Sequence, residues 1–335
     1  MAHAPHPLAT LDQIIKSPSS IDGIPKEVED DLRTTGCMLI QEAGVMLGLP
    51  QDTIATAQVI FQRFYYVSSL YSFGVNDISI SSLFLSTKLC ETPIRLRDLI
   101  NTYLFLLARI QYLLNLPPDT RLISNKISNG SSWQASVGQS PKGKAKDQYP
   151  IWNEFRFEVP GFHDGVFWEW KDVITASEMQ ILKRLGFNMQ VDLPYSHMIN
   201  YLKILDLVFE DQVAQMCWSI LNDMLLTSMY VIHPPHTLAC ASILLATRLL
   251  RIPLPSEWYI LFDAEYDDMW TCCCHVMKLY SDWGLDKLQG SDSSGLADSD
   301  ERQKGKENRW RRAWVLAQSK KAVRRWLEER EKAIA

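Results

Sequence analysis

The sequence has few helix-breaking residues and no long apolar run. Its 335 residues include only 15 glycines and 16 prolines, which excludes collagen-like and linker-like chains. Long periodic stretches between them favour an all-helical protein. The most apolar runs, 103–114 and 238–250, are short and contain Arg109 and Arg248, so neither is expected to cross a membrane. Because no basic segment followed by an apolar core begins the chain, no secretory signal is predicted.

Patterns typical of enzymes and metal sites are also missing. The sequence has no Gly-x-Gly-x-x-Gly, no P-loop and no His-Glu-x-x-His. His233 and His236 flank two prolines in a rigid turn without a third ligand nearby. Cys272, Cys273 and Cys274 are adjacent, which suits neither a zinc site nor a disulfide framework. We interpret them as buried small hydrophobic residues in a reducing compartment. No catalytic residue, cofactor or metal is therefore predicted.

Charge is distributed unevenly along the chain. Between Arg302 and Lys332 there are 12 Lys/Arg and 4 Asp/Glu, which is a local net charge of +8. Because the net charge of the whole chain is −5, the remaining residues carry a net charge of −13. An acidic body argues against direct DNA binding by the domains. The basic segment 301–335 carries Trp310 and Trp314 at helical spacing and is predicted to be an amphipathic helix. It is open to three interpretations, namely a docked helix, a nuclear import signal, or a weak anion or RNA contact.

Hydrophobic periodicity divides the chain into two helical units. The predicted segments are an extended N-terminal arm (1–28), a first unit (29–190) with an irregular insertion at about 115–165, a second unit (191–285), a linker (286–300) and the basic tail (301–335). Helices of the first unit are expected to begin near 28–31 and at 52, and to span 77–90, 95–114 and 168–185.

An internal repeat supports the division into two units. A shift of 160 residues places 82–89 on 242–249, and the next proline of the first segment on that of the second, without a gap. Both segments end in threonine, a basic residue and leucine, and the basic residues are Lys88 and Arg248. Two similar helical units, each with a central helix of small and apolar residues, are therefore predicted.

Two charged residues occupy apolar helical faces. Lys88 follows Phe84 and Leu85 on a helix predicted to be buried, and Glu178 lies on the apolar stripe of the predicted helix 168–185. A charge there costs free energy unless it is paired or hydrated. Taken singly, Lys88 is also explained as a lysine at the C-terminal end of a helix. Glu178 is also explained as a residue at the edge of a solvated helical face. Taken together, they predict a pair that faces a partner protein.

Several segments resemble the cyclin family. The segments similar to the first cyclin box are 31–41, 57–66, 85–100 and its last helix 178–187, and 194–283 is similar to the second box. Within the family the chain resembles the transcription-associated group, and cyclin L most, through Ser17–Gly23, Leu32-x-x-x-Gly36-Cys37 and Arg248-x-x-x-Ile252-Pro-Leu-Pro255. The resemblance implies an all-α fold of two tandem five-helix cyclin-box domains, with an irregular insertion in the first and a basic C-terminal helix.

The resemblance also implies a function. It is that of a nuclear regulatory subunit, without catalysis of its own, that binds and activates a cyclin-dependent serine/threonine kinase in RNA polymerase II transcription or RNA processing. In that family a lysine that ends the third helix and a glutamate in the fifth contact the kinase, and they match Lys88 and Glu178. Phe84 and Leu85 are expected to add apolar contact. Of two acidic residues that usually follow the lysine, only Glu91 is present, as a further contact candidate.

Two other functions stay open at this point. A cyclin-fold transcription factor that binds DNA directly would need basic domain faces and usually a zinc ribbon, whereas the body is acidic and Cys37 is the only cysteine before Cys90. A helical scaffold without a kinase would differ in one measurable respect, since it would not raise the activity of a co-expressed kinase.

Overall fold

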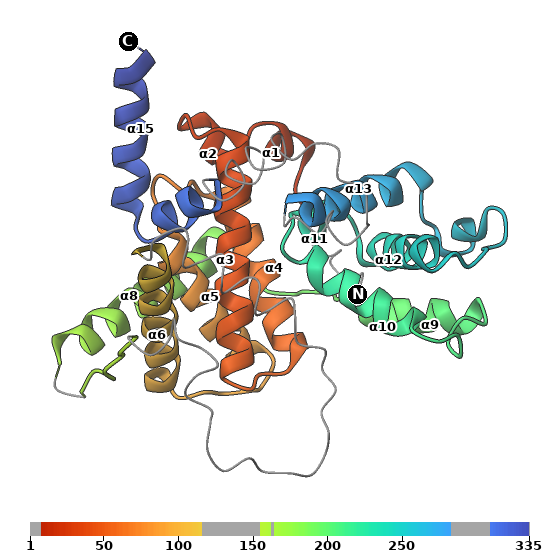
Figure 1. Ribbon diagram of the computed structural model, residues 1–335, viewed down its shortest axis with the longest axis horizontal. Coiled ribbons are helices and arrows are strands. Elements are labelled where there is room, and N and C mark those ends of the chain that lie inside the picture. Colours follow the sequence, from red (N-terminus) through yellow and green to blue (C-terminus); the bar gives the residue numbers. More distant parts are fainter. Residues whose placement is uncertain (1–7, 116–154, 162–163, 283–308, 335) are drawn as a thin grey trace, which may run out of the picture.

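A computed structural model describes residues 8–115, 155–161, 164–282 and 309–334. All regular structure in these residues is helical, which confirms the predicted all-α class. Figure 1 shows two groups of helices side by side, the N-terminal group in red to yellow-green and the second in green to light blue, and the dark-blue end of the chain lies with the first group. None of the described helices is long and apolar enough to cross a lipid bilayer.

Within the part of the chain that the structure describes, five helices form the first unit, as the sequence predicts. They are α3 (Lys26–Met46), α4 (Gln51–Val67), α5 (Val75–Leu89), α6 (Leu96–Asn115) and α8 (Gly165–Arg184). In α4 every residue from Thr53 to Tyr66 is buried, because α3, α5 and the second unit surround it. The predicted helix starts agree with the observed ones to within a few residues, and apolar periodicity is strongest in α3, α4 and α6.

The central helix α5 is buried although it is rich in serine. The hydroxyl groups of Ser79, Ser81 and Ser86 donate hydrogen bonds of 3.0, 2.7 and 2.8 Å to carbonyl oxygens three or four residues earlier in the same helix. These bonds satisfy the three hydroxyl groups within the helix itself, and the small side chains let neighbours approach closely. Because α3, α4 and α8 all pack against α5, its C-terminal turn is held in a fixed position.

The second unit follows the same plan as the first. Its elements are α9 (Tyr195–Ile204), α10 (Val213–Met224), α11 (Met229–Ile232), α12 (Pro235–Leu250), the 3₁₀ helix η2 (Trp258–Phe262) and α13 (Tyr266–Asp282). The central helices α5 and α12 begin at Val75 and Pro235, which is the 160-residue shift of the sequence repeat. Within the described residues this unit has four helices of ten residues or more, where five were expected.

The N-terminal arm differs from the extended segment predicted for 1–28. It contains α1 (Leu11–Ile15) and α2 (Pro18–Ile21), capped by the hydroxyls of Thr10 and Ser17. Helices of one turn are too short to show a hydrophobic period, so the sequence analysis missed them. The Ser17 hydroxyl also donates a hydrogen bond to the buried carboxylate of Glu29, at 2.5 Å, and this bond fixes the arm on α3.

Part of the predicted insertion is described. Residues 155–161 have no helical structure, in agreement with the irregular segment that the sequence predicts there. The rings of Phe155 and Phe157 lie 5.8 and 5.5 Å from that of Phe105 on α6, in edge-on geometry. The predicted linker 286–300 lies outside the described residues.

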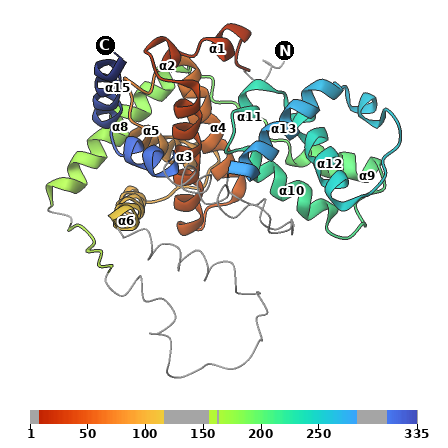
Figure 2. The ribbon, with the colours of Figure 1, turned by 45° about the horizontal axis from the view of Figure 1, so that its top comes forward.

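The basic tail packs on the first unit. Residues 309–317 are helical and α15 (Lys320–Ile334) follows. Figures 1 and 2 both show α15 against the first unit, on the side away from the second. Side chains from both tail helices enter the core of the first unit; these are Leu316, Ala317, Val323 and Leu327. This packing supports the docked-helix interpretation. It does not test the predicted anion or RNA contact or the predicted nuclear import, and Lys321 of the tail is exposed.

One arginine ties the tail to both units. The Arg309 guanidinium donates hydrogen bonds of 2.6 to 2.9 Å to the buried carboxylate of Asp31 and approaches Asp282 at 3.4 Å. The hydrogen bonds with Asp31 raise the pKa of Arg309 above its ordinary value. An ion pair of this geometry is charge-assisted and bidentate, so it orients the tail helix on α3.

Candidate functional site

The last turn of α5 meets the middle of α8. Lys88 and Glu178 are far apart in the sequence, yet the Lys88 Nζ lies 2.5 Å from the Glu178 Oε1. The same two helices are also in contact two turns earlier on α5, where the Ser81 hydroxyl lies 3.4 Å from the carbonyl oxygen of Ile174. Figure 1 shows α8 beside α5 and α6. The structure therefore brings together the two charged residues that the sequence analysis singled out.

The pair lies at the surface and is accessible. The Lys88 side chain is 47% exposed and that of Glu178 is 15% exposed. The Lys88 ammonium also lies 4.1 Å from the centroid of the Phe84 ring, as a cation–π contact. An exposed ion pair contributes only about 0–1 kcal/mol to stability, and an exposed cation–π contact about 0.5–1 kcal/mol. The two charges are therefore available to a partner without a large cost to the fold.

The other three candidate residues have different positions. Phe84 is half-buried next to Lys88. Leu85 is only 4% exposed and belongs to the core, so it supports the surface from beneath and cannot itself offer the apolar contact expected of it. Glu91 is exposed just after α5, with a left-handed φ of 54°. Within the described residues its carboxylate forms no ion pair.

The two helices that carry the pair, α5 and α8, also expose apolar side chains, which apolar periodicity alone does not reveal. Leu89 is 42% exposed at the end of α5, and Val173 and Met179 on α8 are 36% and 46% exposed. Ala176 lies three residues from each of these α8 residues and shares their exposed face. Apolar contacts rimmed by charge are typical of protein-binding surfaces. We call Lys88, Glu178, Leu89, Val173 and Met179 the α5–α8 surface.

The residues considered for metal binding or catalysis have ordinary surroundings. His233 Nδ1 lies 3.8 Å from a carboxylate oxygen of Asp268, and burial lowers the pKa of His233. Among the described residues no three metal-ligating side chains cluster. Cys274 is exposed, unlike its neighbours Cys272 and Cys273, which corrects the prediction that all three are buried. The Cys274 side chain follows that of Cys273 around α13 and points away from the buried face of the helix.

Comparisons with known proteins agree with this architecture. The family model described as "Cyclin, N-terminal domain" matches residues 8–109. The sequence is 34% identical over 272 residues to Cyclin-L1 of Danio rerio and 32% identical over 272 residues to Cyclin-L2 of Homo sapiens. The chain belongs to the cyclin family. These alignments cover 81% of this cyclin but only 46% and 44% of the relatives, so the chain spans less than half of their length.

A solved structure shares the fold of this cyclin. It is the crystal structure of the yeast RNA Pol II CTD kinase CTDK-1 complex, in which the matched chain has a TM-score of 0.57 and 17% identity. The match covers 82% of this cyclin and 73% of that chain. At this identity the likeness shows the fold alone. It is the fold expected from the sequence, namely an all-α fold of tandem cyclin boxes.

Proposed function

We propose that this cyclin is a regulatory subunit that binds and activates a cyclin-dependent serine/threonine kinase, in nuclear RNA polymerase II transcription or RNA processing. The observation that carries the proposal is the α5–α8 surface, where two helices hold an accessible ion pair, Lys88 with Glu178, and also expose apolar side chains. Its family membership and the likeness to the L-type cyclins support the same function.

Each part of the α5–α8 surface has a separate role in binding. Leu89, Val173 and Met179 supply apolar area that loses contact with water in the complex, and burial of apolar area provides most of the binding free energy. Lys88 and Glu178 supply one charge of each sign in a fixed geometry, which sets the orientation of the kinase. Glu91 adds a further acceptor at the edge, and Leu85 fixes the position of Lys88 from the core.

Activation follows from a shift between two states of the kinase. A kinase whose C-helix is turned outward has lost the lysine–glutamate ion pair that positions ATP. A rigid cyclin surface that binds only the inward state shifts the equilibrium by its difference in affinity for the two states. The firm packing of α5 against α3, α4 and α8 provides the required rigidity.

Charge reversal at Lys88 tests the proposal. The variant Lys88→Glu should no longer co-purify with the kinase, whereas its helical content by circular dichroism stays unchanged because the side chain is half exposed. The matched control is Lys203→Glu on α9, an exposed lysine in the other unit. Affinity purification followed by mass spectrometry identifies the kinase, and phosphorylation of an RNA polymerase II C-terminal-domain peptide measures its activation.

A double variant separates contact with the kinase from a purely structural role. Lys88→Glu combined with Glu178→Lys restores the ion pair within the chain but presents the charges to the kinase in reversed order. If the pair contacts the kinase, this variant folds normally and still fails to bind. Restored binding by the double variant, or retained binding by Lys88→Glu, would contradict the proposal.

A further inference from the structure

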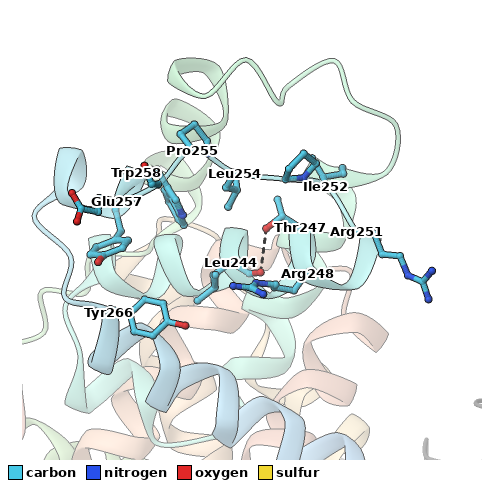
Figure 3. A pocket seen from close by; sticks show the side chains of 13 residues that line it. Leu244, Thr247, Arg248, Arg251, Ile252, Leu254, Pro255, Glu257, Trp258 and Tyr266 are labelled. Carbon is cyan, nitrogen blue, oxygen red and sulfur yellow. Dashed lines mark hydrogen bonds between the residues drawn. The ribbon is translucent and has the colours of Figure 1, made fainter.

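A pocket of the second cyclin box lies where α12 ends. Its volume is about 590 Å³, within the ~300–1,000 Å³ range of ligand-binding pockets. Figure 3 shows Leu254, Pro255 and Trp258, from the segment that follows α12, on one side, and Leu244 and Tyr266, from α12 and α13, on the other. Aliphatic, proline and aromatic side chains thus form most of its walls.

The charged residues of the pocket lie at opposite ends. Arg248 extends along the α12 side and Arg251 lies at the rim, whereas Glu257 lies at the far end (Figure 3). Both arginines are exposed, and within the described residues neither guanidinium has an ion pair or a hydrogen bond. The pocket is therefore positive at one end and negative at the other.

The internal repeat shows what Arg248 lacks. Arg248 in α12 is the counterpart of Lys88 in α5, and each follows a buried threonine at the end of its helix. In the first unit α8 supplies Glu178 to neutralise the lysine. In the second unit no carboxylate of the described residues neutralises the arginine. The same position thus keeps its basic residue in both units but has an acidic partner only in the first.

We propose that this pocket binds an extended segment of a partner protein in which an acidic residue stands next to an apolar one. The acidic side chain pairs with Arg248, whose planar guanidinium can bind both oxygens of a carboxylate or phosphate. The apolar side chain packs between Trp258 and Tyr266, since aromatic-lined grooves accept extended peptides. Glu257 repels acid at the other end and thereby sets the direction of the bound segment.

A random ten-residue peptide library displayed on phage tests the proposal on the full chain. Selection on the wild type should enrich peptides with Asp or Glu beside an apolar residue. The variant Arg248→Gln should bind a dye-labelled copy of the selected peptide roughly 10-fold more weakly, the loss expected for one charge-assisted pair. Arg97→Gln, which removes an exposed arginine of α6 in the other unit, is the matched control and should bind like the wild type.

Two further probes define the ligand. Changing the acid of the selected peptide to its amide should weaken binding as much as Arg248→Gln does, and a phosphoserine in place of the acid tests whether phosphate serves better than carboxylate. Selection without acidic enrichment, equal binding by Arg248→Gln, or tighter Arg248-dependent binding of a ten-nucleotide RNA would overturn the proposal. Because no kinase takes part in this assay, its failure leaves the proposed function of the α5–α8 surface untouched.

Discussion

Replacing Gly36 by alanine should destabilise the first cyclin box, although alanine is the better helix former. Gly36 lies on α3 where it faces the buried ring of Phe61 on α4. A Cβ atom at this position would lie 2.1 Å from the Phe61 Cζ, about 1.3 Å short of the 3.4 Å at which ordinary contact begins. The ring cannot turn away freely, since it also packs edge-on against Tyr65 at 5.1 Å.

Two opposing effects set the magnitude. Alanine in place of glycine inside a helix contributes about 1 kcal/mol of stability. Overpacking a rigid core costs about 1–3 kcal/mol, and occasionally more. Because the overlap with Phe61 is large, we expect the higher cost and a net destabilisation of about 1–2 kcal/mol, which corresponds to a fall in Tm of about 2–8 °C for a domain of this size.

Thermal unfolding followed by circular dichroism measures this effect, and a second substitution identifies its cause. In the double variant Gly36→Ala with Phe61→Leu, the shorter side chain makes room for the new methyl group. The loss of unfolding free energy in the double variant should therefore be smaller, by about 1 kcal/mol or more, than the sum of the losses in the two single variants. A Gly36→Ala variant as stable as the wild type, or strictly additive effects in the double variant, would refute the close approach of α3 and α4.

Two further predictions concern the tail and pH. Arg309→Ala removes the bidentate partner of buried Asp31 and, among the described residues, leaves only Arg312, at 3.9 Å. This change should release the tail, so that amide exchange in α15 becomes faster, whereas Lys321→Ala should leave exchange unchanged. Equal protection in both variants would contradict this role of Arg309. Burial lowers the pKa of His233 more than the nearby Asp268 raises it. Below about pH 6.5 the His233 side chain therefore binds a proton more readily in the unfolded chain than in the folded one. The free energy of unfolding falls as the pH drops. His233→Asn should lessen the fall in Tm between about pH 7.5 and 5.5, and an unchanged fall would contradict the assignment.

Helix positions and the division into two units could be predicted from the sequence, because both depend on local patterns. The period of apolar residues is strong in α3, α4 and α6, and the repeat relates α5 to α12 at a shift of 160 residues. Lys88 and Glu178 could be found because each interrupts an apolar helical face, and the resemblance to cyclins gave them a common role. Neither observation fixed the distance between them, which depends on how α8 crosses α5.

Exposure was decided only by the tertiary structure. On α5, apolar and small residues occur on every side, so no periodicity distinguishes buried Leu85 from exposed Leu89. The outcome depends on which helix covers which side of α5, and α8 is separated from it by the insertion. The unpaired state of Arg248 has the same origin, since the repeat predicts a basic residue there but cannot show that its carboxylate partner is missing. Periodicity is a property of neighbouring residues, whereas burial and pairing depend on segments distant in the chain.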